Sequence, residues 1–360
     1  MIHASSRQVG QVFRKILPYT ITAVALFSLF AAYYSMGDRT RLIDKTSMLM
    51  GSEVEIKIPV AGDGDRARIE SAIGEAFKEI KALEDLLSVF KTDSVTSRID
   101  RLKAGEKLNL DVEIFTLIKK SVEYSDKTRG AFDITIKPLA DLWNASGEEK
   151  KLPAENDIRD ALEKVGARKI LLDEADMTIS LEKEGMGIDL GGIGQGYATD
   201  KATQILKGRG IKSAIVNSSG DIYCLGTRSG KKLWKIGIQH PRRRDEIIFE
   251  IFLKDKAIST SGDYEKYFVL NGKRYSHIID ARTGYPVGDD VVSASAVAVD
   301  STTADAFATA LCILGESGLD VAESFNIDAI IIVKDRAGLL GVKMTKGFKA
   351  KYGLIEKAKL

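Results

Sequence analysis

The chain has 360 residues, of which 44% are hydrophobic, 29% are charged and only two are cysteines. This composition is typical of a globular protein and excludes a disordered, collagen-like or disulfide-stapled chain. Residues 1–35 hold three basic residues and no acid, so the rest of the chain carries 50 basic against 51 acidic groups. A folded part this close to neutral argues against nucleic acid as a partner, because neutralising phosphates requires a clustered basic surface.

The first predicted element is a membrane anchor. Residues 16–34 contain no charged side chain, and at about 1.5 Å per residue they approach the ~30 Å hydrocarbon core of a bilayer. Arg14 and Lys15 precede this run and should stay cytoplasmic. A cleaved secretory signal is the alternative, but its apolar region is usually only about 7–15 residues long. We therefore expect residues 1–35 to be a cytoplasmic tail with a single-pass inner-membrane anchor, and the remainder to be periplasmic.

The exported part is predicted to be rich in strands. Residues 36–50 are expected to form a tether, residues 52–59 a strand with alternating apolar positions, and residues 65–90 a long amphipathic helix. Further strands are expected at 214–225, 234–239, 247–253, 291–299 and 329–333, and further helices at 114–127, 156–165, 196–207 and 304–314. Strands outnumber helices without alternating with them. This order predicts a mixed α/β (α+β) fold with largely antiparallel sheets flanked by helices.

Several common motifs are absent from the sequence. There is no phosphate-binding Gly-x-x-x-x-Gly-Lys-Ser/Thr, no His-Glu-x-x-His and no Cys-x-x-Cys. Beyond residue 35 the only histidines are His240 and His277, too few for an ordinary zinc site, so a bound metal should be a hard cation such as Mg²⁺ or Ca²⁺. Cys224 and Cys312 either pair or remain buried free thiols, and spacing does not decide between these outcomes.

A cluster of four glycines lies in the segment Asp189–Asp200, between a strand-like run and a helical one. Glycines let the backbone approach a ligand closely, and a helix that begins there favours an anionic phosphate. The spacing Gly-x-Gly-x-Gly differs from that of a dinucleotide-binding Rossmann motif. The same residues also suit a tight structural turn, so this segment alone leaves both interpretations open.

Two later segments carry further candidate groups. In residues 301–310 a helix is expected to place Asp305 and Thr309 four residues apart on one uncrowded face, where they could hold one hard cation. The alternative is that Asp305 only complements the positive helix end. In residues 275–286 His277 lies near an acid and a cation and could act as a base or a phosphate contact, although a lone histidine is often structural.

Taken in order, these segments resemble the FAD:protein FMN transferase (ApbE) family over residues 50–315. The blocks that carry the resemblance are Met50–Ser52, Phe90 with Ser94–Arg98, Gly130–Asp133, the glycine segment, Asn217–Asp221, Thr260–Tyr264, Ser276–Asp280, and Ala304–Ala306 with Thr309. The family implies a T-fold-like architecture over residues 51–360. This sequence departs from it at Gln195, where many members have Lys, at Ala281, where Pro is usual, and at Ala308, where some have a second acid.

The resemblance also implies the site residues and the reaction. The FAD site would be lined by Met50, Phe90, Ala131, Phe132, Asp133, Gly191, Tyr197 and Ile279, and Mg²⁺ would be held by the Gly194 carbonyl and the side chains of Asp305 and Thr309. Catalytic roles fall to Asp305 and to His277, as base or phosphate contact. FMN would pass from FAD to a threonine hydroxyl of an exported flavoprotein subunit, such as those of Rnf- or Nqr-type redox pumps, with release of AMP. The alternatives are an FAD pyrophosphatase, a non-catalytic FAD-binding protein and an anchored interaction protein without a ligand.

Overall fold

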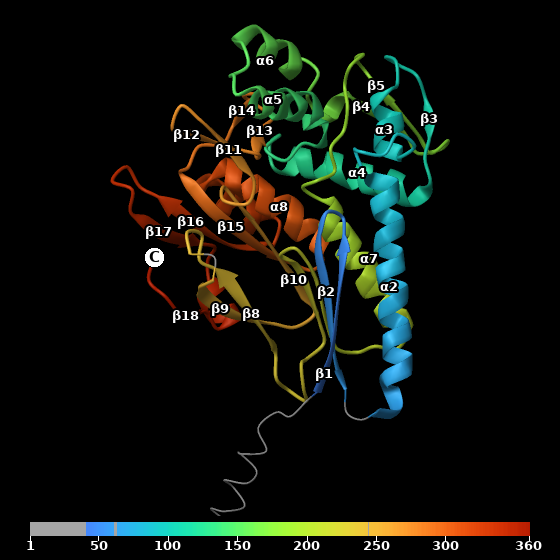
Figure 1. The fold of residues 1–360 in the computed structure, drawn as a ribbon, viewed down its shortest axis with the longest axis vertical. Coiled ribbons are helices and arrows are strands. Elements are labelled where there is room, and N and C mark those ends of the chain that lie inside the picture. The colour runs from blue at the N-terminus through green and yellow to red at the C-terminus, as the bar shows by residue number, and fades with distance from the viewer. Residues whose placement is uncertain (1–40, 61–62, 244) are drawn as a thin grey trace, which may run out of the picture. The chain divides into compact units, whose positions relative to one another are not determined.

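The structure, a computed structural model, describes residues 41–60, 63–243 and 245–360. Its centre is a sheet with the strand order β1-β2-β6-β7-β10-β15-β16-β17 (Figure 1). Neighbouring strands from β2 to β17 all run antiparallel. The strands of this sheet are β1 (Arg41–Leu49), β2 (Ser52–Val60), β6 (Ala214–Ser218), β7 (Asp221–Leu225), β10 (Lys256–Gly262), β15 (Val291–Ala298), β16 (Asp328–Lys334) and β17 (Leu340–Met344).

Both faces of this central sheet are covered. In β16, Ala329 and Ile331 belong to one hydrophobic core, whereas Ile330 and Ile332 belong to another. This alternation follows from the strand geometry, which points successive side chains to opposite faces. The helices that pack on the first face are α2 (Arg66–Leu87), α4 (Val112–Lys127), α7 (Gly194–Gly208), α8 (Ser301–Leu314) and α9 (Glu316–Ser324). The second face packs against a three-stranded sheet of β8 (Trp234–Gln239), β9 (Ile247–Leu253) and β18 (Ile355–Glu356), with α10 (Phe348–Tyr352).

A group of smaller elements gathers at one end of the central sheet, at the top of Figure 1. Its helices are α3 (Val95–Asp100), α5 (Lys137–Glu149) and α6 (Glu155–Leu162). The short 3₁₀ turns η2 (Ile134–Ile136) and η3 (Ala167–Lys169) lead into α5 and β4, and a third, η1 (Asp63–Asp65), precedes α2. Its strands are β3 (Leu108–Asn109), β4 (Ile170–Asp173), β5 (Thr178–Leu181), the hairpin β11 (Tyr267–Leu270) with β12 (Lys273–Ser276), and the pair β13 (Ile279–Asp280) with β14 (Tyr285–Pro286). These elements surround the end of the sheet at which the candidate site lies.

Helix α8 is central to the site and is fixed firmly at its N-terminus. Asp300 caps it by accepting a hydrogen bond from the Thr303 N–H at 2.7 Å. Asp200 of α7 accepts two more, from the N–H groups of Ser301 at 2.8 Å and Thr302 at 2.9 Å. These carboxylates satisfy donors that a helix start leaves without partners. Because most residues of α8 are small, α7 and the sheet can approach its backbone closely.

The predicted fold class is confirmed, with local corrections. The long helix, the other predicted helices and the mixed, mainly antiparallel sheets are all present. The tether over 36–50 is wrong for its described part, because residues 41–49 form edge strand β1 of the central sheet. The single run expected at 214–225 is two strands, separated by a turn at Ser219 and Gly220, both of which have positive φ.

The predicted anchor over residues 16–34 lies outside the described residues. Within the part of the chain that the structure describes, no helix combines the length and the apolar character needed to cross a bilayer. Cys224 and Cys312 are both buried and both free, so the two described cysteines form no disulfide.

Candidate active site

The glycine loop, residues 189–200, leads directly into α7. The Gly191 N–H donates to Asp189 Oδ1 at 2.7 Å, and the Gly194 N–H donates to the Leu190 carbonyl at 2.7 Å. These two bonds fold the loop tightly before the helix begins at Gly194. The predicted structural turn is therefore present, and it places the N-terminus of α7, which attracts anions, beside the loop.

The glycine loop packs against α8. The Gly196 N–H donates to Asp305 Oδ2 at 3.0 Å. A Cβ at Gly196 would overlap the Ser301 carbonyl and lie 2.8 Å from the Asp305 Cβ, so only glycine fits this contact. One turn later along α8, the Thr309 hydroxyl would lie 3.1 Å from a Cβ placed on Gly192. The two segments predicted to share a site, far apart in sequence, therefore lie in contact.

Asp305 is buried, with 6% of its surface exposed. The expectation from the sequence that it stands on an uncrowded face is wrong, because α7 covers that face. Burial raises the pKa of Asp305 to about 7, against the hydrogen bond from Gly196, which lowers it. Burial together with the charge of Asp305 also raises the pKa of Asp221, which lies on β7, well above its usual range.

The residues present fit a divalent cation. Among the described residues, neither Asp305 nor Asp221 forms an ion pair with a basic side chain, although both are buried. Buried negative charge without a partner is costly, and a cation would relieve that cost. The carboxylate of Asp305 and the hydroxyl of Thr309 are oxygen ligands of the kind that Mg²⁺ prefers.

Few protein carboxylates are available to hold a cation at this site. The described part of the chain holds no group of three or more histidine, cysteine, aspartate or glutamate residues arranged to bind a metal. An ion at Asp305 would therefore need hydroxyl and carbonyl oxygens, such as those of Thr309 and Gly194, and oxygens from a bound substrate or water. A cation that keeps substrate and water ligands is what a phosphate-transfer site requires.

Several residues predicted to line the FAD site gather around the glycine loop. The Met50 side chain, in the turn between β1 and β2, comes within 3.7 Å of a Cβ placed on Gly194. The Phe132 ring comes within 3.5 Å of one placed on Gly192. Gly191 is exposed on the loop itself. These three predicted residues, from three separate segments, therefore lie around the glycine loop, which contacts Asp305 at Gly196.

Tyr197 continues this neighbourhood on α7. Its ring packs partly buried between two of the hydrophobic cores. Its hydroxyl donates to Glu113 Oε1 at 2.8 Å, and the Lys201 ammonium contacts the same carboxylate oxygen at 2.8 Å. The Tyr197 hydroxyl is therefore held by protein groups, which leaves its ring as the part available to a ligand.

The segment Ala131–Asp133 lies beside this neighbourhood, and its side chains have structural roles. Ala131 and Phe132 are buried in the core. The Asp133 carboxylate accepts from the N–H groups of Thr135 and Ala167, both at 2.8 Å. It borders a cavity of about 500 Å³ that is also lined by Arg129.

Two other predicted FAD-site residues lie apart from the glycine loop. Phe90 follows α2 and is 95% exposed, so nothing in the described protein covers its ring. Ile279, on β13, is buried against α5 and α6 in a small core of its own. The turn after β13 does contact the segment that precedes Phe132. The Arg282 Cγ lies 3.6 Å from the position that a Cβ on Gly130 would occupy.

His277 is held at the junction between β12 and β13. Its Nδ1–H and its backbone N–H both donate to the Lys266 carbonyl, at 2.8 and 3.1 Å. This bond selects the tautomer in which Nε2 is the free acceptor. Shielding from water by neighbouring protein lowers the pKa of His277, and the charge of Asp189 opposes this shift. The residue nevertheless keeps an exposed surface. A neutral imidazole thus lies within electrostatic reach of the glycine loop.

Sequence reasoning missed three carboxylates near Asp305. The charges of Asp200 and Glu265 raise the pKa of both Asp305 and Asp221, and Asp221 is itself buried. Asp221 and Glu265 do lie inside or next to the motif blocks, but nothing in their spacing shows that β7 and the β10–β11 connection converge on α8. That convergence is set by the antiparallel order of the central sheet.

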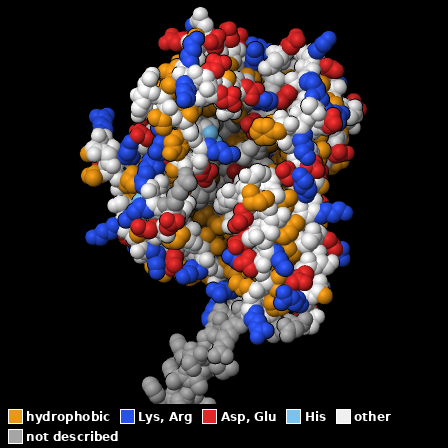
Figure 2. All heavy atoms as spheres, in the orientation of Figure 1, with side chains coloured by type: hydrophobic (Ala, Val, Ile, Leu, Met, Phe, Trp, Pro, Cys, Tyr) orange, Lys and Arg blue, Asp and Glu red, His pale blue; other side chains and the backbone are white. Residues whose placement is uncertain are grey.

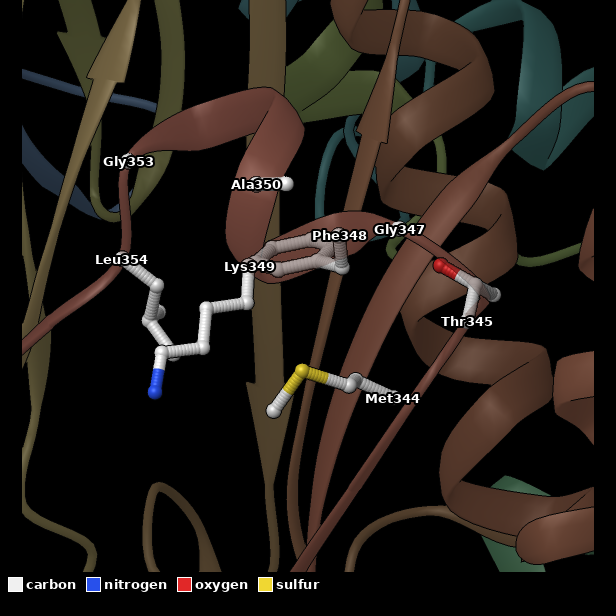
Figure 3. A pocket seen from close by; sticks show the side chains of 8 residues that line it. All are labelled: Met344, Thr345, Gly347, Phe348, Lys349, Ala350, Gly353 and Leu354. Carbon is white, nitrogen blue, oxygen red and sulfur yellow. The ribbon is translucent and has the colours of Figure 1, made fainter.

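The surface around these elements is concave. Figure 2 shows a hollow near the centre of the face in view, in the region where Figure 1 draws α8, with charged side chains of both signs at its rim. A second cavity, of about 680 Å³, lies at the C-terminal segment and is lined by Met344, Phe348, Lys349 and Leu354 among others (Figure 3). It shares no residue with the candidate site.

Comparison with known protein families identifies the family of this chain. The model described as the ApbE family matches residues 50–331. The chain belongs to the ApbE family. Two similar curated proteins are each called FAD:protein FMN transferase: that of Vibrio cholerae is 31% identical over 88% of this chain and 94% of its own, and that of Klebsiella pneumoniae is 30% identical over 82% and 90%. As a member of this family the chain is an enzyme, a transferase.

Solved structures agree with this ApbE assignment. The crystal structure of the ApbE protein from Thermotoga maritima has a TM-score of 0.76 and 33% sequence identity to this chain. The match covers 86% of this chain and 99% of that one. The mixed fold with antiparallel sheets is therefore the ApbE fold.

Proposed function

We propose that this protein is a Mg²⁺-dependent FAD:protein FMN transferase. The observation that carries the proposal is the contact between the glycine loop and α8. It brings Asp305 and Thr309 to the positive end of α7, beside buried carboxylates without cationic partners. A diphosphate bridged to a divalent ion matches this combination of anion and cation sites. The shared name of the relatives supports FAD as the diphosphate and a protein as the acceptor.

In this proposal the chain's own groups have distinct tasks. Asp305, Thr309 and the Gly194 carbonyl hold the ion, which, when bound, neutralises charge on the diphosphate. The glycine loop and the start of α7 cradle the phosphates. His277, with Nε2 free, accepts a proton or, once protonated there, donates to a phosphate oxygen. The tight contact at Gly196 holds the glycine loop and Asp305 in place before substrate binds, and such preorganisation lowers the barrier to transfer.

The flavin and adenine parts would lie against the predicted lining residues. These are Met50, Phe90, Ala131, Phe132, Asp133, Gly191, Tyr197 and Ile279. Met50, Phe132 and Gly191 already surround the glycine loop. The exposed Phe90 ring is available to stack on a planar ligand, an interaction that aromatic rings favour.

The compartment and the acceptor complete the proposal. Residues 16–34 would anchor the protein in the inner membrane and keep the domain on the periplasmic side. The acceptor would be a threonine of an exported flavoprotein subunit of an Rnf- or Nqr-type redox pump. An anchored enzyme and an anchored acceptor share one membrane surface, which raises their effective concentration.

Incubation of the full-length protein with FAD, Mg²⁺ and such an acceptor subunit tests the proposal. Transfer predicts equal amounts of AMP and of acceptor that shows flavin fluorescence after denaturing electrophoresis. AMP without labelled acceptor would identify an FAD pyrophosphatase instead. Bound FAD with no AMP would identify a flavin-binding protein without turnover. Replacing the acceptor threonine with valine is the control, because it removes the hydroxyl and keeps the shape.

A further inference from the structure

Three segments at one end of the central sheet carry an excess of basic side chains, and we call their surface the basic end. They are residues 207–213, from the last turn of α7 to the start of β6, residues 226–233, between β7 and β8, and residues 254–256, between β9 and β10. Together they hold eight lysine and arginine residues against one acid, Asp255. The near-neutral balance of the whole chain conceals this local excess.

Contacts join the three segments into one surface. The Ser213 hydroxyl donates to the Thr227 carbonyl at 2.6 Å, and the Gly226 N–H donates to Asp255 Oδ1 at 2.8 Å. A Cβ on Gly226 would overlap the Lys212 carbonyl, so the first two segments touch at a position that only glycine fits. The basic residues of three separate parts of the chain therefore lie together.

The cations of the basic end face solvent. Six of the eight basic residues are exposed and the other two are half-buried. Two of them have acidic partners, because Arg209 pairs with Glu75 and Lys254 with Asp255. Within residues 41–60, 63–243 and 245–360, three of the lysines pair with no acid, and these are Lys212, Lys231 and Lys256. Figure 2 shows lysine and arginine side chains at the lower end of the face in view.

The chemistry of the basic end fits an anionic lipid surface. Lysine and arginine side chains are attracted to acidic headgroups over about one screening length, ~8 Å at physiological salt. Leu233, which follows Lys232 in the same segment, is 42% exposed. A leucine among lysines suits a lipid surface in particular, because a bilayer offers negative charge with an apolar interior beneath it.

The described chain enters the fold at this same end. Strands β1 and β2 are neighbours joined by the turn at Met50, so β1 begins at the end of the sheet opposite that turn. Strand β2 pairs with β6, with Lys57 beside Ile215, which places this opposite end next to the basic end (Figure 1). The predicted anchor, residues 16–34, is separated from β1 only by residues 35–40, which span at most about 20 Å.

From this arrangement we propose that the basic end binds anionic headgroups of the membrane surface, an inference that rests on the membrane location in the proposed function. The bound domain directs the other end of the sheet away from the bilayer. That end carries the candidate site, since the Met50 side chain lies 3.7 Å from a Cβ placed on Gly194. At ~3.3 Å per residue, the nine residues of β1 hold the site about 30 Å from the lipid, so the acceptor hydroxyl must reach that height.

A polarity-sensitive dye on the basic end of the full-length protein tests the proposal. Ser229→Cys supplies the attachment point, because Cys224 and Cys312 are buried. The protein is reconstituted in phosphatidylcholine vesicles with or without phosphatidylglycerol. Dye emission should shift to the blue only with phosphatidylglycerol, and the shift should vanish at about 1 M salt, where the screening length is ~3 Å. The same dye on Thr92→Cys, an exposed position beyond α2 at the site end, should not respond.

Two charge variants, each carrying the dye at position 229, complete the test. The first removes the three unpaired lysines of the basic end and should lose the response to phosphatidylglycerol; it combines Lys212→Gln, Lys231→Gln and Lys256→Gln. The second removes the same charge from exposed lysines among the smaller elements at the site end and should keep the response; it combines Lys103→Gln, Lys150→Gln and Lys151→Gln. Melting curves establish that each variant is folded.

Four results would overturn the inference. These are a blue shift in phosphatidylcholine alone, a shift that survives high salt, a full shift in the basic-end variant, and equal losses in the two variants. If the basic-end variant keeps the shift but its KM for the acceptor subunit rises, the surface binds the acceptor and not lipid. Failure of the proposed function is seen separately, because flotation of the wild type with phosphatidylcholine vesicles reports the anchor and acceptor labelling in detergent reports transfer.

Discussion

The Gly196 backbone N–H donates a hydrogen bond to the Asp305 carboxylate at 3.0 Å, and this bond joins the glycine loop to α8. It consumes one helix N–H of α7 and orients one buried carboxylate oxygen, which leaves the other oxygen for a ligand. Because the residue at 196 has no Cβ, α7 and α8 approach closely enough for the bond to form. The anion-binding helix start and the predicted cation ligand are therefore held by the same contact.

Gly196→Ala should damage both stability and activity. Its Cβ would overlap the Ser301 carbonyl and lie 2.8 Å from the Asp305 Cβ, so the two helices must separate. Overpacking of this kind typically costs about 1–3 kcal/mol. Chemical denaturation should show that loss. Gly208→Ala, at the other end of the same helix, has nothing within 4 Å of its Cβ and should leave stability unchanged or slightly higher. Equal stability of the two variants would contradict the packing argument.

Asp305→Asn should weaken the pH dependence of stability in the metal-free protein. Burial raises the pKa of Asp305 to about 7, from an ordinary value of about 4. The folded protein therefore binds a proton that the unfolded chain lacks between about pH 4 and 7, and stability is lost as pH rises through that range. In EDTA the wild-type melting temperature should fall by several degrees from pH 5 to 8, since about 1 kcal/mol moves it by roughly 2–4 °C.

The asparagine variant keeps the volume and the acceptor for Gly196 but carries no charge. Its melting temperature in EDTA should depend less on pH between 5 and 8 and should exceed that of the wild type at pH 8. Addition of Mg²⁺ should raise the wild-type value at pH 8 and leave the variant unchanged, because a ligand that binds only the folded state stabilises it. Turnover should be lost in the variant. A full Mg²⁺ response in Asp305→Asn would exclude this residue as a metal ligand.

Thr309→Val should weaken the response to Mg²⁺ without unfolding the protein. The Thr309 hydroxyl lies close to Gly192 and 3.5 Å from the Ser261 hydroxyl, on a half-buried position of α8. Valine preserves the branched shape and removes one oxygen ligand. We expect about a tenfold higher Mg²⁺ concentration for half-maximal turnover, which corresponds to about 1.4 kcal/mol. An unchanged Mg²⁺ requirement would show that the hydroxyl contributes nothing to the ion.

Asp200→Ala should cost more stability than Asp300→Ala, although both residues cap the same helix. Asp300 is half-exposed and forms an ion pair with Lys120. Asp200 lies between α7 and α8 and accepts three hydrogen bonds. Loss of a helix cap usually costs about 0.5–2 kcal/mol, and leaving buried N–H groups without partners adds to that. Urea denaturation of the two variants measures the difference. A larger loss for Asp300→Ala would contradict this account of the α8 start.

Local patterns in the sequence were sufficient to predict most helices and strands but not all the contacts between them. The periodicity of α2 and the alternation of β2 follow from side-chain burial on one face, so they could be read directly. Strand β1 was missed because its charged residues resemble a linker, and only pairing with β2 at the sheet edge makes it a strand.

For the candidate site, too, local patterns predicted the parts but not the contacts between them. Glycine spacing and the Asp305–Thr309 pair indicated two parts of it, and the family resemblance joined them. The burial of Asp305 could not be predicted, because it depends on α7 crossing α8 at Gly196. The place of Glu265 is likewise set by the register of β10, β11 and their partners, which no local pattern encodes.

Phe90→Ala separates ligand binding from stability. The ring is 95% exposed and contributes little to the folded core, so the free energy of unfolding should change by less than about 0.5 kcal/mol. If Phe90 stacks on the flavin or adenine ring, the FAD dissociation constant should rise about five- to tenfold, in keeping with the ~1 kcal/mol that an aromatic pair contributes. Leu339→Ala, which truncates an exposed apolar side chain between β16 and β17, is the control. Equal FAD affinity in the wild type and Phe90→Ala, measured by quenching of flavin fluorescence, would remove this residue from the FAD site.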